Sequence, residues 1–149
     1  MKRRTFLKGS MVAGTAAMAA GAGLLAPRAV LAAYPKTQFE AKSVDAALGG
    51  SYESSNNIKI KAPDIAENGT VVPVRVTTDI AGVSSISILA VENGMPMTSK
   101  FVLGEGAIGY VSTRIKMGKT SDVLAVVEAG GKMYADKKEV KVTIGGCGG

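Results

Sequence analysis

The chain offers one side chain with clear nucleophilic chemistry, the thiol of Cys147, its only cysteine. This residue lies within Gly145-Gly146-Cys147-Gly148-Gly149, with two glycines on either side. Because glycine has no Cβ and adopts both signs of φ, these residues should form a flexible arm. Fully extended, five residues reach roughly 17 Å, so the arm can carry the thiol into a narrow pocket of another protein.

The sequence around Cys147 favours a carrier thiol over a catalytic one. A free thiol is mostly protonated at neutral pH, and no lysine or arginine adjoins Cys147 to favour the reactive thiolate. We therefore expect the thiol to be activated inside the active site of a partner. The chain has no histidine and no second cysteine, which excludes an internal disulfide, a dithiol redox motif and a conventional zinc or haem site. We expect no catalytic residue, no cofactor and no metal site in this chain.

The residues before the arm predict a β-strand. Residues 139–144 alternate charged or polar with apolar side chains, which is the pattern of a half-buried strand. This strand would deliver the chain directly to the glycine arm.

Several segments resemble the SoxY family, the sulfur-carrying subunit of bacterial thiosulfate-oxidising (Sox) systems. The most specific segment, residues 138–149, is similar to the C-terminus of that family, and its Gly-Gly-Cys-Gly-Gly shows no departure from the family pattern. The similarity continues in Ala-Pro-Asp-Ile-Ala-Glu-Asn-Gly at 62–69, Val-Pro-Val at 72–74 and Thr-Arg-Ile-Lys-Met at 113–117. It covers essentially all of the chain after residue 32, although the opening helical segment is short for the family.

The resemblance implies a carrier protein rather than an enzyme, with a sandwich fold. Cys147 would be loaded with a thiosulfate-derived group by a haem enzyme similar to SoxXA. A hydrolase similar to SoxB would release sulfate, and a sulfane dehydrogenase similar to SoxCD would oxidise the remaining sulfur. The resemblance also implies a heterodimer with a small β-protein similar to SoxZ, as in the SoxYZ complex.

Residues 1–32 have the features of a twin-arginine signal peptide. Arg3-Arg4 precede an uncharged, alanine- and glycine-rich segment, and Ala-Val-Leu-Ala at 29–32 fits a small-x-small cleavage site. The uncharged segment is only modestly hydrophobic and is short for a membrane anchor. We expect cleavage after Ala32, release into the periplasm and no membrane attachment afterwards. Because this pathway carries folded proteins, it also favours assembly with a partner before export.

Removal of the signal peptide changes the charge of the chain. The full chain has 18 basic and 12 acidic residues, a formal net charge of +6. Five basic residues and no acidic residue precede residue 33, which leaves 13 basic and 12 acidic residues and a net charge of +1. This balance argues against nucleic-acid binding, which requires a basic surface.

Residues 33–144 are long enough for one domain, and residues 145–149 form the arm. A short helix is predicted at 39–48, ended by Gly49-Gly50, and residues 51–57 are predicted as a turn. Short strands are predicted at 58–61, 72–77, 83–91, 100–103, 107–117, 122–128 and 133–144. The pattern predicts an all-β, immunoglobulin-like antiparallel β-sandwich with a short N-terminal helical segment.

Three local patterns refine this prediction. Pro73 donates no ladder hydrogen bond, which predicts an edge strand or a bulge at 72–77. The apolar run at 123–127 predicts a strand buried on both faces. Thr-Arg-Ile-Lys at 113–116 places cations on one strand face, which we interpret as a solvated face, with partner contact as the alternative.

Three functions compete on this evidence. The first is a covalent sulfur carrier that works through Cys147. The second is a non-catalytic structural or adaptor subunit that dimerises through its lone cysteine. The third uses a C-terminal Gly-Gly carboxylate, as ubiquitin-like sulfur carriers do, but that chemistry needs ATP, which we expect only inside the cell. Intact mass after exposure to thiosulfate and the partner enzymes separates the first two.

Overall fold

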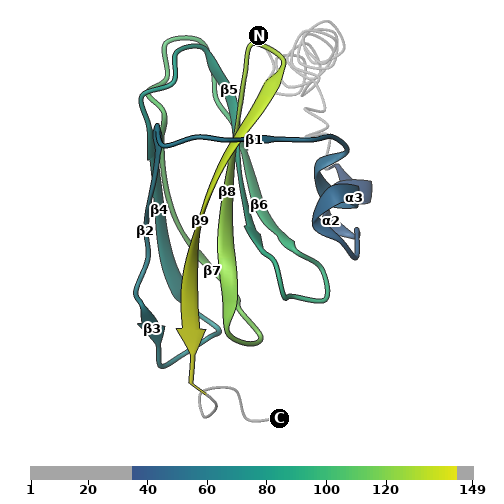
Figure 1. Cartoon of the computed structure of the whole chain (residues 1–149), viewed down its shortest axis with the longest axis vertical. Helices are drawn as coiled ribbons and strands as arrows, with labels where there is room; N and C mark the ends of the chain where they lie inside the picture. Colours follow the sequence, from purple (N-terminus) through teal and green to yellow (C-terminus); the bar gives the residue numbers. More distant parts are fainter. Residues whose placement is uncertain (1–34, 144–149) are drawn as a thin grey trace, which may run out of the picture. The chain divides into compact units, whose positions relative to one another are not determined.

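Two β-sheets enclose a common core in the part of the chain that the computed structural model describes, residues 35–143 (Figure 1). The larger sheet has the strand order β1-β9-β8-β5-β6, with β3 also pairing with β9, and the smaller sheet has the order β2-β4-β7. The strands are Glu53–Ser54 (β1), Ile58–Lys61 (β2), Ile65–Ala66 (β3), Val72–Thr78 (β4), Val83–Ala90 (β5), Met97–Val102 (β6), Tyr110–Ile115 (β7), Ser121–Ala129 (β8) and Lys132–Val142 (β9). The predicted all-β sandwich is confirmed.

Alternating side chains build the core between the two sheets. In β4, Val72, Val74 and Val76 are buried, whereas the residues between them are exposed. These valines belong to one cluster with Ile86 and Ile88 of β5. The three valines therefore form the inward face of β4.

Strand β8 is buried on both faces, as its apolar run predicts. Val123 and Val127 lie in the core between the sheets. Leu124 and Val126 point to the other face and belong to a second cluster, which includes residues of helix α3 (Val44–Leu48). The larger sheet thus has the smaller sheet on one face and the helical segment on the other, so β8 exposes little to solvent.

The prediction of a single helix at 39–48 is wrong in its extent. The structure has two short helices, α2 (Lys36–Phe39) and α3. Helix α3 begins after Ser43, whose side-chain oxygen accepts a hydrogen bond from a first-turn backbone N–H at 3.3 Å, and this cap explains the break. It ends as predicted at Gly49, whose φ of 69° is in the left-handed region. In the range 35–143, no helix is long and apolar enough to cross a membrane.

Two short strands depart from the antiparallel arrangement that the sequence predicts. Strand β1 lies within residues 51–57, which are predicted as a turn, and pairs in parallel with β9 through Glu53 and Tyr134. Strand β3 pairs in parallel with the end of β9, at Lys141 and Val142. Each strand has only two residues, too few to show alternation, and its partner lies far along the chain. As a result, β9 pairs with β1 as well as β8 near its start, and with β3 at its end, just beyond the last pair with β8.

Pro73 lies in β4, which is the middle strand of the smaller sheet, where the sequence predicts an edge strand or a bulge. Strand β7 pairs with β4 from Val72 to Thr77. Strand β2 pairs only with the later part of β4 and ends at Lys61, opposite Arg75. The described strands therefore leave one side of β4 unpaired at Pro73, and the sheet tolerates its missing donor there.

Candidate functional site

The predicted site residues, Cys147 and the four glycines around it, lie outside the described residues, as does the predicted signal peptide at 1–32. The structure describes the chain as far as Thr143, one residue beyond β9. We define the arm base as residues 138–143, the segment that leads to the predicted arm. The contacts of the arm base decide where that arm starts.

A threonine side chain extends the β8–β9 ladder to the end of β9. The last backbone pair between these strands joins Ser121 to Val140. Beyond it, the backbone N–H of Val142 donates a hydrogen bond to Oγ1 of Thr120 at 3.0 Å. Thr120 thus takes the place of a strand partner and holds one side of the arm base.

Strand β3 holds the other side of the arm base. The backbone N–H of Lys141 donates to the carbonyl of Asp64 at 3.0 Å, and that of Thr143 donates to the carbonyl of Ala66 at 3.1 Å. Hydrogen bonds on both sides leave the end of β9 little freedom to swing, so its position and direction are fixed.

The side chain of Lys138 ties the arm base to the segment between β2 and β3. Its Nζ donates to the carbonyl of Ala62 at 2.7 Å and lies 3.0 Å from Oδ1 of Asp64. The side chain of Lys138 is only 32% exposed, whereas that of Asp64 is 89% exposed. The bond to the carbonyl is the better protected of the two contacts, because solvent screens an exposed ion pair.

Gly69 packs directly under the arm base. It is buried, and its carbonyl accepts a hydrogen bond from the backbone N–H of Met117 at 2.7 Å. A Cβ at this position would lie 2.9 Å from Cγ1 of Val142 and closer still to the carbonyl oxygen of Met117. Both contacts are too close for a real Cβ. Gly69 therefore lets the side chain of Val142 approach the turn that follows β3.

Strand pattern predicts β9 but not the residues that fix its end. Thr120 lies immediately before β8 and Gly69 lies in the turn between β3 and β4, where strand alternation carries no information. The resemblance to the SoxY family nevertheless points to these residues, because the segment at 62–69, which resembles that family, contacts the arm base. The carbonyl oxygens of Ala62, Asp64 and Ala66 accept hydrogen bonds from the arm base, and Gly69 leaves space for Val142.

The arm base supplies position rather than chemistry. Within residues 35–143, no group of three or more His, Cys, Asp or Glu side chains is placed to hold a metal ion. Midway along β9, Lys137 donates a hydrogen bond to the carboxylate of Asp122 at 2.9 Å, and this bond raises the pKa of Lys137. That pair lies on the surface, so the shift marks a structural contact and not a reactive group.

Comparisons with known proteins give a family and a fold. A family model described as the sulfur oxidation protein SoxY matches residues 44–147, so the match ends at Cys147. The solved structure of the sulfur carrier protein SoxY from Chlorobium limicola f thiosulfatophilum has 48% identity and a TM-score of 0.59, covering 66% of this chain and 92% of its own. The superoxide reductase (neelaredoxin) from Ignicoccus hospitalis has 22% identity and a TM-score of 0.52, covering 59% of this chain and 81% of its own, and shows a shared fold alone. No curated protein matches the sequence.

Proposed function

We propose that this chain, which belongs to the SoxY family of sulfur oxidation proteins, carries the intermediates of thiosulfate oxidation on Cys147. A carrier role in sulfur oxidation follows from the family. The proposal adds the thiosulfate-derived group, its attachment to Cys147 and the enzymes that process it. In this proposal the chain contributes no catalytic residue and no cofactor, and enzymes similar to SoxXA, SoxB and SoxCD act on the attached group.

The anchored arm base is the observation that carries the proposal. A carrier needs a rigid body and an attachment point that can enter several active sites. Hydrogen bonds that the arm base donates to Thr120, Asp64 and Ala66 fix the end of β9, and Thr143 is four residues before Cys147. The glycines on both sides of Cys147 predict a flexible segment with no side chain to obstruct a narrow entrance.

Loading of Cys147 is an oxidation that joins two sulfur atoms. The thiol loses its proton and forms an S–S bond to the terminal sulfur of thiosulfate, while two electrons pass to the haem enzyme. Hydrolysis then cleaves the bond between that sulfur and the sulfonate group. The oxygen of water leaves in sulfate, and one sulfur atom stays on Cys147 as a persulfide. The dehydrogenase then oxidises this outer sulfur to a sulfonate; the electrons pass to the enzyme, and water supplies the oxygen atoms. A second hydrolysis releases the sulfonate as sulfate and restores the thiol of Cys147.

Intact-mass spectrometry tests this function directly. The protein incubated with thiosulfate and the SoxXA-like enzyme of its source cell is expected to gain the mass of one thiosulfate-derived group on Cys147. Addition of the SoxB-like hydrolase should then remove only the sulfate portion. A disulfide-linked dimer as the sole new species would favour the adaptor role instead, and an unchanged mass would exclude loading.

We also propose that the twin-arginine pathway exports the protein together with a SoxZ-like partner. Exposed apolar side chains such as Val102 and Ile108, which are 80% and 77% exposed, suit a protein interface. Replacing Arg3 and Arg4 with lysine is expected to leave both proteins in the cytoplasm, with residues 1–32 uncleaved. Immunoblots of cell fractions measure this result. Normal periplasmic levels of the double variant would be incompatible with this route.

A further inference from the structure

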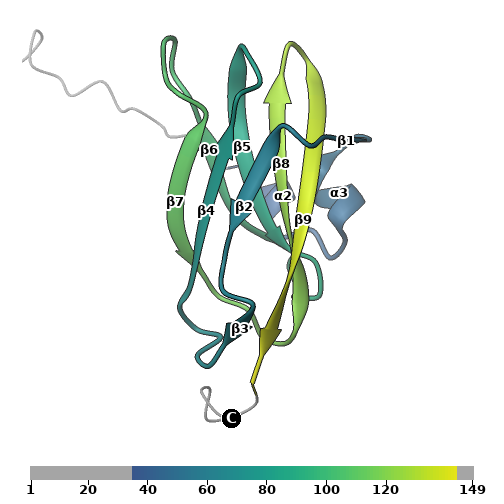
Figure 2. The same ribbon diagram turned by 60° about the vertical axis from the view of Figure 1, so that its left-hand side comes forward.

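Four basic side chains share the outer face of the smaller sheet, whose strands β7, β4 and β2 lie side by side in Figure 2. The four residues, which we call the basic face, are Lys59 and Lys61 of β2, Arg75 of β4 and Arg114 of β7, and all are exposed. The other exposed residues of these strands are Pro73, Thr77, Tyr110 and Ser112. None of them is a carboxylate, and Asp79 follows β4 at the end remote from Pro73.

The overall composition does not account for the basic face. Residues 35–143 contain 13 basic and 12 acidic residues. The basic face holds four of the basic residues and none of the acidic ones. Other lysines of this range form ion pairs, such as Lys119 with Glu92 and Lys138 with Asp64. The four cations of the basic face have no ion-pair partner within the described part of the chain.

Stability does not explain the arrangement of the basic face either. Lys61 and Arg75 lie directly opposite each other in the antiparallel register of β2 and β4. Like charges at such positions destabilise a sheet. The guanidinium carbon of Arg75 lies 5.9 Å from the centre of the Tyr110 ring, which offsets part of this repulsion for Arg75 alone. An anionic partner would offset the repulsion for both residues.

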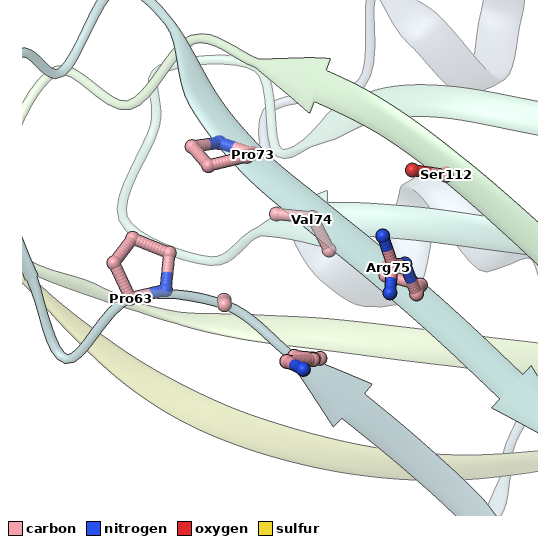
Figure 3. Close-up of a pocket in the computed structure, with 7 residues that line it drawn as sticks. Pro63, Pro73, Val74, Arg75 and Ser112 are labelled. Carbon is pink, nitrogen blue, oxygen red and sulfur yellow. The ribbon is translucent and has the colours of Figure 1, made fainter.

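A groove of about 380 Å³ lies on the basic face where β2 leaves the sheet. Figure 3 shows Pro63, on the chain that follows β2, on one side of the groove, and Pro73 and Arg75, along β4, on the other. Lys61 also lines the groove. A carboxylate side chain fits this lining, because the prolines contact its methylene groups while Lys61 and Arg75 attract its charge.

The groove lies close to the arm base. Pro63 lines the groove, and Ile65, two residues further along, pairs with Lys141 at the end of β9. In both Figure 1 and Figure 2, β3 lies beside the end of β9. A protein bound at the groove would therefore be next to the start of the predicted arm.

We infer that the basic face docks a carboxylate-rich surface of an enzyme that processes the group on Cys147. This inference rests on the proposed function. Permanent interfaces are mainly apolar, whereas charged surfaces suit partners that bind quickly and leave again, as a carrier requires. A second copy of the same face is excluded as the occupant, because it would bring like charges together.

Initial rates with the SoxXA-like and SoxB-like enzymes of the source cell test the inference. Lys61→Glu with Arg75→Glu is expected to lower kcat/KM about tenfold or more with at least one of these enzymes at low salt, because attraction becomes repulsion. The loss should shrink at high salt, and kcat should be retained. The matched control is Lys42→Glu with Lys132→Glu, which makes the same charge change at exposed sites off the basic face and should alter the rates less than about twofold.

Equal losses in both double variants, or unchanged rates in both, would overturn the inference. The single variant Lys61→Glu distinguishes a loss of docking from a loss of folding. It replaces a like-charge pair by an opposite-charge pair, so its Tm should be unchanged or raised while its rate with the same enzyme still falls. A normal rate in this folded variant would also count against docking at the groove.

Fluorescently labelled poly-glutamate separates this inference from the proposed function, because its binding does not require Cys147. The unsubstituted protein should bind poly-glutamate, and Lys61→Glu with Arg75→Glu should lose most of that binding even if Cys147 is never loaded. Tighter binding to phosphatidylglycerol vesicles than to poly-glutamate, lost in the same variant, would assign the basic face to a lipid surface instead. Binding to neither probe would refute an anion-binding face.

Discussion

Replacing Cys147 with serine is expected to abolish covalent loading and leave the fold intact. A serine hydroxyl cannot form the sulfur–sulfur bond that loading requires, so the mass gain with thiosulfate and the SoxXA-like enzyme should fall to background. The core clusters and the contacts of the arm base join residues within 35–143, so the Tm should not change. Intact mass and thermal unfolding of the same samples measure the two effects.

The companion variant for this experiment is Gly146→Val with Gly148→Val, which keeps the thiol. Branched side chains stiffen the segment and widen it, so turnover by the partner enzymes should fall while reaction with a small thiol reagent is retained. Normal turnover with every partner would refute a flexible arm. A proportional loss with the small reagent would show that the glycines tune the thiol itself.

Replacing Gly69 with alanine is expected to destabilise the folded chain by roughly 2 kcal/mol or more, because the new methyl group overpacks a buried site. The Cβ would meet the carbonyl of Met117, which cannot move without disturbing the backbone, and Cγ1 of Val142 at 2.9 Å. Since Val142 is in the arm base, the same displacement should also weaken its hydrogen bond to Thr120. Urea unfolding measures the loss in the free energy of unfolding.

Gly94→Ala is the matched control for this prediction. No atom lies within 4 Å of a Cβ at position 94, and Gly94 is not among the glycines with positive φ. Its free energy of unfolding should therefore be unchanged or raised by up to about 1 kcal/mol, because alanine restricts the unfolded chain. Equal losses in the two variants would mean that the space at Gly69 is not what the fold requires.

The parts of the fold that follow from local alternation could be predicted from the sequence. The inward valines of β4 and the double burial of β8 each arise from a run of neighbouring residues with a period of two. The break between α2 and α3 was predictable in principle, since Ser43 is a favoured N-cap residue. Apolar residues continue on both sides of Ser43, so the hydrophobic pattern alone does not reveal the break between the two helices.

The pairing of distant segments could not be predicted in the same way. Strands β1 and β3 have two residues each, and their position against β9 depends on how the whole sandwich closes. The basic face depends on pairing too. Taken alone, Arg114 indicates only a solvated strand face. It becomes part of a cluster of cations only when the pairing of β2, β4 and β7 brings Lys61 and Arg75 onto the same face.

The same distinction between local pattern and distant pairing applies to the candidate site. Cys147 stands out by its chemistry and by the glycines around it, and no pairing needs to be known to find it. Thr120 and Gly69 stand out only once Val142 is known to lie beside both. Position in the fold, rather than residue type, gives these two residues their role.

The order of strands along the chain has a consequence for synthesis. Strand β9 follows β1, β3 and β8 in the chain and pairs with all three, so the larger sheet cannot close before β9 leaves the ribosome. Contacts between such distant segments also form late in folding. A chain that stops before β9 lacks both the cysteine and the strand that completes the sheet, and it stays open to proteolysis. We therefore expect a chain that lacks the thiol for this reason to lack a closed sandwich as well, so that only chains with a complete larger sheet carry Cys147.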